Sequence, residues 1–333
     1  MSQPPVKLGL VGAGHLGRIH AKCLGLLGDA VEVVGVHDLD GASAKRVADQ
    51  YGFPTADSLE DLCALAEGVV IVTPTVTHAV LAKAALGAGC HVFVEKPVTA
   101  TVEEARELEA LGASLGRVIQ VGHVERFNPA FRALADDPPR PVFIEAHRLA
   151  EFNPRSTDVS VVLDLMIHDL DLVLALIDAP LERVSASGVG VVGQSVDIAN
   201  ARLDFANGAT ANLTASRISL KSMRKLRLFA PDAYVSVDLL AHETEVLRLS
   251  DHDPAAPGPL QLPTEEGLRE VVFDRPAVEK TNAIRDELAE FAAAIRGEAT
   301  VRVGITPARR ALELAHEIIA DIDRRRRTLL ASL

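Results

Sequence analysis

The chain has 333 residues, of which 48% are hydrophobic and 24% charged, and its formal net charge is −12. This length exceeds what one hydrophobic core usually serves, so two domains are expected. The acidic balance argues against nucleic acid or an anionic membrane surface as the main partner, because each of these requires a basic face.

The three cysteines have no CxxC spacing, which argues against a disulfide framework or a zinc site and is typical of reduced thiols. The sequence contains no uncharged apolar run near the length of about 18 residues that spans a membrane. Its N-terminus also lacks the pattern of a secretory signal. We therefore expect a soluble cytoplasmic protein without a membrane partner.

Up to about residue 122, short apolar runs alternate with amphipathic helical runs. The predicted strands cover residues 6–12, 31–38, 68–74, 90–95 and 117–122, and the predicted helices cover 15–27, 41–51, 57–66, 78–89 and 102–116. Thr77 is expected to cap one of these helices, and Thr101 with Glu104 forms a capping-box pattern at another. Strands that alternate with helices of 10–15 residues predict an α/β fold, here a doubly wound parallel sheet of the Rossmann type.

From about residue 123 the pattern changes to consecutive strand-like segments. Short helices are expected at 129–136 and 161–173 and later helices at 280–296 and 306–327, with strands at 142–149, 183–193, 197–208, 209–218 and 225–240 and a loop at 253–263. Asn207-Gly208 between two alternating runs is a hairpin signal. Consecutive strands predict an open, mostly antiparallel sheet. Its uncovered face would favour a homodimer or homotetramer, if that face is apolar.

The segment VKLGLVGAGHLGRIH places GxGxxG directly after a strand and at the start of a helix. Gly12 permits the tight turn, Gly14 lets a pyrophosphate approach the backbone, and Gly17 lets the helix pack on the strand. His15 and Leu16 open the helix whose N-terminus would hold the phosphates. Asp38 ends the second strand, where a ribose-binding acid is expected. Together these features predict a dinucleotide site.

The carboxylate of Asp38 favours NAD over NADP, because it would accept hydrogen bonds from ribose hydroxyls and repel a 2′-phosphate. His37, Lys45 and Arg46 lie nearby in the sequence and keep NADP as the alternative. The first domain, residues 1–122, is thus predicted to bind NAD(P). Residues 123–333 are predicted to form the substrate-binding and oligomerisation domain.

Three further motifs give the chain a family resemblance. A TP…H segment lies at residues 73–78, EKP at 95–97 and DxxxH at 164–168. In combination with GxGxxG, they resemble the Gfo/Idh/MocA oxidoreductase family over essentially the whole chain. The resemblance implies a metal-free hydride transfer, with Thr73, Pro74, Thr75 and His78 beneath the nicotinamide half of the cofactor.

Lys96 follows a predicted parallel strand, at the sheet edge where open α/β sheets bind ligands. Its cation could hydrogen-bond a substrate oxygen and stabilise negative charge that develops there. Pro97 would stiffen the turn, and Glu95 would pair with Lys96 or hold a ribose hydroxyl. The alternative is an exposed lysine in a turn.

The apolar segment VVLDLMIHDLDLV contains Asp164 and His168 at positions i and i+4. Burying such groups costs several kcal/mol unless they are paired, which indicates a function. His168 is the predicted general base, because imidazole can take a hydroxyl proton as hydride leaves the same carbon. Asp164 would orient the ring, whereas Asp171 is predicted to be structural. A metal held by Asp164 and His168 is the weaker alternative, because no third ligand has a clear spacing.

The segments at 121–131 and 145–158 are expected to border the substrate pocket. The sequences HVERFNPA and HRLAEFNPR in these segments resemble the subgroup of this family that acts on UDP-N-acetylglucosamine. That resemblance implies oxidation of the sugar 3-hydroxyl to a ketone, on the route to the amino sugar of lipid A. The predicted substrate contacts are Lys96, Asp164 and His168 together with Arg126, Asn128, Arg148 and Arg155.

Two alternatives remain open at this point. Residues 159–161 are Val-Ser-Val where many family members have three glycines, which weakens transfer from the sugar and inositol dehydrogenases. A dehydrogenase of a free sugar or polyol, such as inositol, is still the nearest alternative. A cofactor-sensing regulator without catalysis is the second, although such relatives tend to lose the lysine or histidine that this chain retains.

Overall fold

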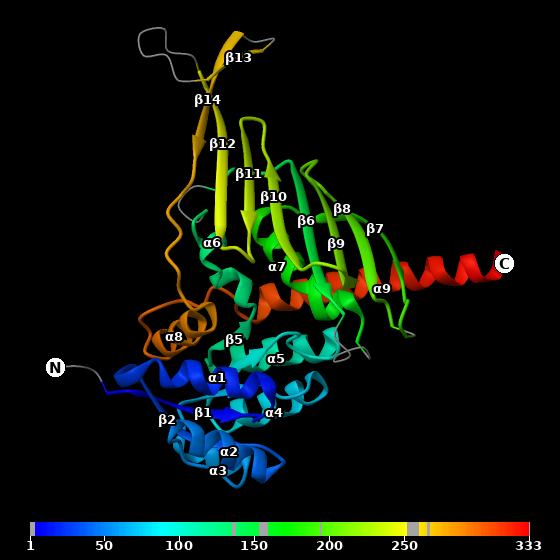
Figure 1. Cartoon of the computed structure of the whole chain (residues 1–333). Helices are drawn as coiled ribbons and strands as arrows, with labels where there is room; N and C mark the ends of the chain where they lie inside the picture. Colours follow the sequence, from blue (N-terminus) through cyan, green and yellow to red (C-terminus); the bar gives the residue numbers. More distant parts are fainter. Residues whose placement is uncertain are drawn as a thin grey trace. The chain divides into compact units, whose positions relative to one another are not determined.

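A computed structural model describes residues 4–134, 138–152, 159–193, 195–251, 260–264 and 267–332 (Figure 1). The chain divides into two compact units. Unit 1 contains residues 1–127 and 282–313, and unit 2 contains residues 128–281 and 314–333. The predicted division after residue 122 therefore differs from the observed one, because a late helical segment packs with the first unit. Among the described residues, no helix combines the length and the apolar composition needed to cross a bilayer.

Unit 1 is built on a five-stranded parallel sheet, as predicted, and the strand order is β2-β1-β3-β4-β5. Its strands are β1 (Val6–Val11), β2 (Val31–His37), β3 (Gly68–Ile71), β4 (His91–Glu95) and β5 (Ile119–Gly122). These strands are almost fully buried, which is why they appear in the sequence as continuous apolar runs.

The helices of unit 1 cover both faces of this sheet. They are α1 (His15–Gly25), α2 (Gly41–Tyr51), α3 (Leu59–Leu65), α4 (Thr75–Gly87), α5 (Val102–Leu115) and α8 (Ala283–Ile295), with short 3-10 turns η1 (Gly28–Ala30) and η2 (Val124–Phe127). Helices α1, α2 and α8 share one apolar core with the sheet. The capping box of Thr101 and Glu104 is present. The predicted cap at Thr77 is wrong, because α4 begins two residues earlier and the Thr77 hydroxyl donates to Pro74 O instead.

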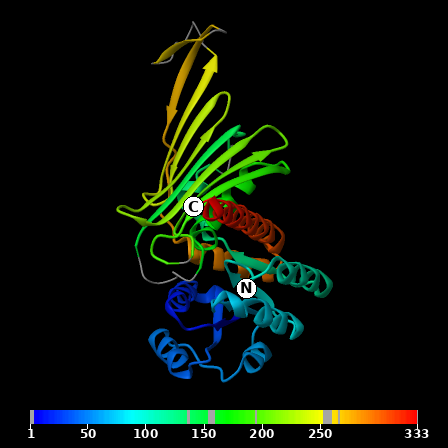
Figure 2. The same ribbon diagram turned by 90° about the vertical axis from the view of Figure 1, so that its right-hand side faces the viewer.

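Unit 2 contains a nine-stranded sheet with the order β13-β14-β12-β11-β10-β6-β9-β8-β7 (Figure 2). All neighbouring strands are antiparallel except β6 and β9, which are parallel. The strands are β6 (Phe143–Glu151), β7 (Leu181–Val189), β8 (Ile198–Phe205), β9 (Thr210–Ser219), β10 (Met223–Phe229), β11 (Ala233–Asp238), β12 (Glu243–Asp251), β13 (Gln261–Thr264) and β14 (Gly267–Asp274).

Three details of this sheet correct the sequence prediction. The segment 225–240 is a hairpin, β10 and β11, because a turn at Ala230–Asp232 divides it. Strands β12 and β14 were not predicted, although the sequence of each alternates apolar and polar residues. Of the predicted loop 253–263, Gln261–Pro263 pairs in β13, whereas residues 253–259 lie outside the described part of the chain. The hairpin at Asn207-Gly208 is confirmed, with Gly208 at φ +83°.

One face of the sheet is covered by helices, and the other carries polar side chains on β8 and β9 and a row of apolar side chains across β6, β10, β11, β12 and β14. The short π-helix η3 (Val162–Met166), α7 (Ile167–Leu176) and the unit 2 part of α9 (Ile305–Ser332) contribute apolar side chains to the core on the covered face. On the other face, strands β8 and β9 present Asn200, Arg202, Asn212 and Thr214. On the same face, neighbouring strands pair five apolar residues that are not buried, Phe143, Phe229, Tyr234, Leu247 and Phe273. Part of the face on which the oligomer prediction depends is thus apolar, but this does not test the assembly itself. The oligomeric state therefore stays a prediction. The remaining helix, α6 (Pro129–Arg132), is shorter than predicted.

Candidate active site

The glycine-rich turn between β1 and α1 has the geometry of a phosphate-binding loop. Gly12 has φ +102°, and a Cβ atom there would lie 2.7 Å from the carbonyl oxygen of Val72. A Cβ atom on Gly17 would lie 2.1 Å from the carbonyl oxygen of Gly12, so the packing of α1 requires this glycine. By contrast, a Cβ atom on Gly14 would meet nothing within 4 Å. The fold thus requires Gly12 and Gly17, and Gly14 leaves open space for a ligand to approach.

Helix α1 begins at His15 without a side-chain cap, since the residue at its N-cap is Gly14. The N–H groups of the first turn are therefore available to an anion, and the helix dipole favours negative charge there. The residues fit the pyrophosphate of a dinucleotide cofactor.

Asp38 lies directly after β2, where the sequence predicts the ribose-binding acid. One carboxylate oxygen, Oδ2, accepts a hydrogen bond from the N–H of Ala13 at 2.6 Å, and the other, Oδ1, accepts from the N–H of Asp40 at 2.8 Å. The two bonds hold the carboxylate in one orientation beside the glycine turn. A carboxylate can accept about four hydrogen bonds, so capacity for sugar hydroxyls remains.

A cavity of about 790 Å³ adjoins this turn within unit 1. It is lined by Val11, Gly12, Gly14, His15, Leu16, His37, Asp38, Leu39, Val72, Thr73, Pro74, Thr77, Val80 and Leu81. This lining is mostly apolar and contains neither lysine nor arginine. Lys45 and Arg46, which kept NADP open in the sequence, are engaged on α2 with Asp49 and Ser43 respectively. Several predicted cofactor residues therefore share one cavity, and among the described residues that line it Asp38 alone carries a carboxylate.

His78 joins two loops at the carboxyl end of the sheet. The side chain is buried, and its Nε2 lies 2.8 Å from Thr73 O while its Nδ1 lies 2.9 Å from Pro97 O. Both carbonyl oxygens only accept hydrogen bonds, so the ring makes both bonds at once only when both nitrogens carry a proton. The loop Thr73–Thr75 is thereby tied to the turn that follows Lys96. The sequence had left open whether His78 touches the cofactor or packs against the loop, and the structure shows this packing.

Lys96 lies half-buried immediately after β4, at the carboxyl edge of the parallel sheet. Its backbone N–H donates to Oε2 of Glu95 at 3.0 Å, and Oε1 of Glu95 lies 2.9 Å from Nε2 of His20. Burial acts to raise the pKa of Glu95, but the His20 hydrogen bond, the charges of His20 and Lys96 and the Lys96 amide outweigh it and lower that pKa. Glu95 is therefore an anion that fixes the backbone beneath Lys96.

In unit 2, Asp164 and His168 lie half-buried on consecutive helical turns. Asp164 lies within the π-helix η3, not in the α-helix that its spacing to His168 predicts. The i, i+4 alignment of an α-helix does not carry over to this wider turn. Single π turns occur frequently at functional sites. Asp171 is buried in α7, as expected for a structural residue.

Arg148 of β6 forms a buried ion pair with Asp169, the residue after His168. Nε lies 3.1 Å from both carboxylate oxygens, and Nη2 lies 2.7 Å from Oδ1. Such bidentate geometry fixes orientation as well as charge. Arg148 therefore ties α7 to the sheet, and its predicted contact with substrate remains untested. Asp169 was not predicted as a site residue, although its position directly after the proposed base His168 could have indicated one.

The other predicted substrate residues lie in different settings. Arg126 is half-buried in η2 of unit 1. Asn128 of unit 2 is buried, where its Oδ1 caps α6 and its Nδ2 donates to Leu239 O at 2.9 Å. Arg155 lies outside the described residues.

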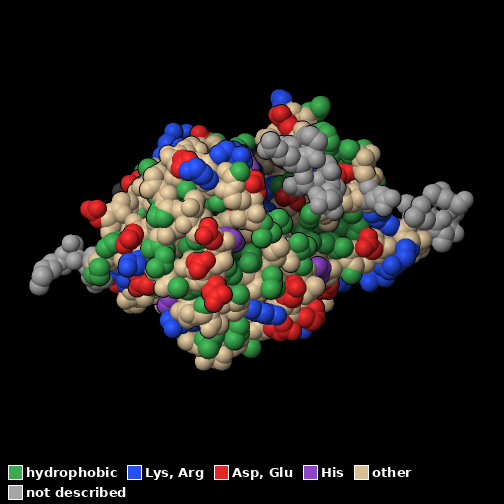
Figure 3. Space-filling model, turned by 90° about the horizontal axis from the view of Figure 1, so that it is seen from below, with side chains coloured by type: hydrophobic (Ala, Val, Ile, Leu, Met, Phe, Trp, Pro, Cys, Tyr) green, Lys and Arg blue, Asp and Glu red, His purple; other side chains and the backbone are tan. Residues whose placement is uncertain are grey.

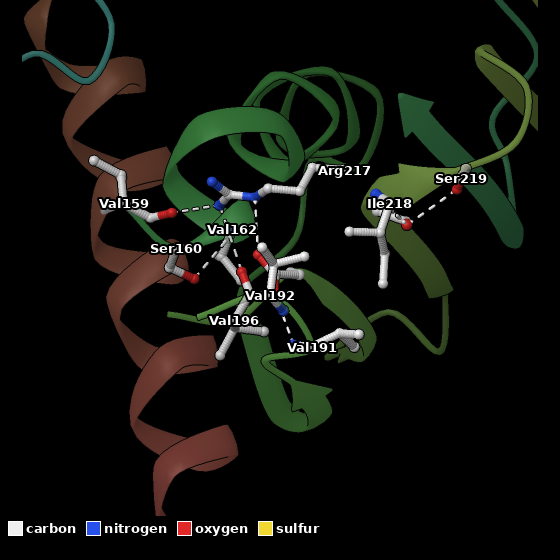
Figure 4. A network of polar contacts seen from close by, with 11 residues as sticks. Val159, Ser160, Val162, Val191, Val192, Val196, Arg217, Ile218 and Ser219 are labelled. Carbon is white, nitrogen blue, oxygen red and sulfur yellow. Dashed lines mark hydrogen bonds and ion pairs between the residues drawn. The ribbon is translucent and has the colours of Figure 1, made fainter. Parts of the chain in front are cut away.

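A second buried ion pair holds the chain that leads into η3 (Figure 4). Arg217 of β9 points its guanidinium at the carbonyl oxygens of Val159 and Val196, and its Nε lies 3.6 Å from Oδ1 of Asp197. The second oxygen of Asp197 accepts from the N–H groups of Val191 and Val192, both at 2.8 Å. One cation thus links β9, the loop before β8 and the residues that precede Asp164.

This network leads to a stability prediction. Replacing Arg217 by Met is expected to lower the free energy of unfolding by about 3–5 kcal/mol, because it leaves the buried Asp197 carboxylate without its cation. Urea unfolding measures the change. Arg202→Met on the exposed face of the sheet is the control, and we expect it to change stability by about 1 kcal/mol or less. Equal losses in the two variants would contradict the role assigned to Arg217.

The surface around unit 1 carries charges of both signs. On the face shown in Figure 3, Asp and Glu side chains are spread over the central region with Lys and Arg side chains among them. The face shown therefore has no region of a single sign over its centre.

A parallel sheet, a glycine turn open at Gly14 and a fixed acid after β2 define a dinucleotide-binding oxidoreductase of the Rossmann class. Residues 6–123 match the model of the oxidoreductase family with an NAD-binding Rossmann fold, and residues 121–233 match the Gfo/Idh/MocA C-terminal domain. The chain belongs to the Gfo/Idh/MocA oxidoreductase family, which confirms the resemblance of its motifs.

The relatives are similar over nearly their full length. The UDP-N-acetylglucosamine 3-dehydrogenase of Acidithiobacillus ferrooxidans is 35% identical over 314 residues, which cover 94% of this chain and 96% of that protein. A solved structure of that enzyme has a TM-score of 0.87, with 33% identity over 97% of this chain and 99% of the other. The inositol 2-dehydrogenase of Rhizobium meliloti is 27% identical and covers 98% of this chain and 99% of that protein.

Proposed function

We propose that this oxidoreductase uses NAD to oxidise the 3-hydroxyl of UDP-N-acetylglucosamine to a ketone. The observation that carries the proposal is the full-length similarity, in sequence and in fold, to an enzyme of that name. The similarity to an inositol dehydrogenase, at lower identity, favours oxidation of a free polyol as the second candidate. Both reactions remove a hydride from a ring carbon that bears a hydroxyl group.

The cavity beside the glycine turn supports NAD over NADP. A 2′-phosphate would bring negative charge next to Asp38, whose carboxylate is already fixed by two backbone amides. The cavity lining offers no lysine or arginine to compensate that charge, because Lys45 and Arg46 are engaged on α2. A ribose with free hydroxyls suits the same carboxylate.

We assign the remaining chemistry to three side chains. When bound, the nicotinamide supplies the hydride acceptor. Lys96 donates a hydrogen bond to the reacting oxygen and stabilises its developing negative charge. His168 takes the hydroxyl proton, and Asp164 orients the imidazole or stabilises its protonated form. A substrate diphosphate requires cations, and the candidates are Arg126, Arg148 and Arg155. Arg148 would use guanidinium N–H groups that do not donate to Asp169.

A substrate panel tests the proposal. With purified enzyme, we expect NAD reduction with UDP-N-acetylglucosamine at a kcat/KM at least 100-fold above that with inositol or glucose, and less reduction of NADP than of NAD. Absorbance at the nicotinamide wavelength measures the rate, and mass spectrometry identifies the ketone by the loss of two hydrogens. Equal or greater kcat/KM with inositol would instead establish the polyol dehydrogenase.

A further inference from the structure

Behind Lys96, three titratable side chains meet in the interior of unit 1. His20 comes from α1, Glu95 from the end of β4 and Glu287 from α8. One nitrogen of the imidazole and one oxygen of each carboxyl group lie within 4.8 Å of one another. His20 and Glu287 are 0% exposed and Glu95 is 7% exposed, so water does not screen the charges in this cluster. We call these three residues the buried carboxyl cluster.

The two carboxyl groups of the cluster have different surroundings. Glu95 has partners for both oxygens, namely His20 Nε2 at 2.9 Å and the Lys96 N–H at 3.0 Å. Neither carboxyl oxygen of Glu287 has a hydrogen-bond partner among the described residues, although the Glu287 backbone carbonyl accepts from Gln120 Nε2 at 2.8 Å. A buried carboxylate without partners is far more costly than a neutral carboxyl group in the same place.

The electrostatics agree with this asymmetry. Burial, followed by the negative charges of Glu95 and Glu290, raises the pKa of Glu287 well above its ordinary value. Cys23 of α1, a further titratable group close enough to sense Glu287, also has a raised pKa, mainly from burial. The cations in this region, His20 when protonated and Lys96, both act on Glu95. One proton held on Glu287 therefore removes a second negative charge from beside Glu95.

We infer that His20 and Glu287 are positioning residues for Lys96. His20 holds the Glu95 carboxylate against the Lys96 amide, and neutral Glu287 leaves that carboxylate as the single anion of the buried carboxyl cluster. His20 and Glu287 act on Lys96 through Glu95, which accepts the hydrogen bond of the Lys96 backbone N–H. This inference rests on the catalytic role proposed for Lys96.

The first test concerns the proton on Glu287. A carboxyl group with a raised pKa in the folded state keeps a proton that the unfolded chain has released, so it lowers stability as pH rises above about 4.3, the unfolded value. Glu287→Gln removes this dependence. We expect its midpoint in urea to rise relative to wild type progressively from pH 5 to pH 8. Glu32→Gln, at an exposed site on β2, is the matched control and should show no such trend.

The opposite trend, with Glu287→Gln losing stability relative to wild type as pH rises, would overturn the neutral state of Glu287. A stoichiometric metal in the purified protein, found by elemental analysis and lost in the same variant, would also overturn it. In that case the three side chains would be ligands.

The second test concerns Lys96. His20→Leu removes the donor to Glu95, whereas His20→Gln retains an N–H group at a similar reach. We expect His20→Leu to reduce kcat at least tenfold with the dissociation constant for NAD changed less than threefold, and His20→Gln to recover most of the loss. Unchanged kcat in correctly folded His20→Leu would overturn the inference.

A readout without substrate separates this test from the proposed function. The rate at which acetic anhydride modifies Lys96, followed by peptide mass spectrometry across pH, reports the environment of the amine. We expect His20→Leu to shift this profile and His20→Gln to restore it, even if no nucleotide sugar is turned over. A profile identical to wild type in both variants would contradict the positioning role.

Discussion

Replacing Lys96 by Met is expected to reduce kcat about 10²–10³-fold, the range found when one donor to a developing oxyanion is removed. Met keeps most of the apolar stem of a half-buried side chain and removes only the cation. NAD binding should change less than threefold, because the glycine turn and Asp38 do not depend on that cation. Stopped-flow assay with UDP-N-acetylglucosamine and fluorescence titration with NADH measure the two quantities.

Lys83→Met is the matched control for this prediction. Lys83 lies on α4 in the same unit and pairs with Glu107 near the surface, so its loss should leave both kcat and cofactor binding unchanged. If the Lys96→Met variant retains at least a third of wild-type turnover, Lys96 does not stabilise the reacting oxygen.

The second large effect is expected at His168. His168→Gln should reduce kcat about 10²–10⁴-fold, because general-base catalysis contributes a factor of that size. The fall of kcat/KM toward acidic pH, which protonation of the base produces, should disappear in the variant. Asp164→Asn should retain that fall and lose less activity, because it perturbs the orientation of the base without removing it.

His147→Gln serves as the control for His168, since His147 lies on the face of the nine-stranded sheet that the helices leave uncovered. We expect it to keep the wild-type pH profile. If His168→Gln retains an acidic limb like that of wild type, another group in the enzyme accepts the proton.

The cofactor half of the fold could be predicted closely because its signals are local. The glycine spacing, the acid after the second strand and the capping box at Thr101 each specify backbone geometry within a few residues. The packing of α8 in unit 1 could not be predicted. Its apolar stripe indicates that the helix packs on a sheet, but it does not indicate which of the two sheets. For the same reason Glu287 was not predicted as a site residue, because its neighbours His20 and Glu95 lie on α1 and β4.

The helical segment that carries Asp164 and His168 shows a different limit to prediction. Apolar residues and the Asp164–His168 spacing predicted a buried helix, but a π turn adds one residue without changing the apolar pattern. Arg148 looked like a substrate contact because a diphosphate needs cations, whereas the structure pairs its guanidinium with Asp169. The carboxylate that pairs with an arginine depends on strand register. The register between two distant segments cannot be predicted from the sequence of either segment alone.

Both oxygens of the Asp38 carboxylate accept hydrogen bonds from backbone N–H groups, and this has a consequence for cofactor affinity. A flexible acid would lose rotamer entropy when it bound a ribose, at a cost of about 0.5–1.5 kcal/mol for an ordered side chain. The backbone N–H groups of Ala13 and Asp40 already hold the Asp38 carboxylate in the protein alone. The side chain therefore loses this rotamer entropy during folding and not when a ligand binds. We therefore expect the affinity for a ribose at this position to depend on the rigid turn as much as on the carboxylate.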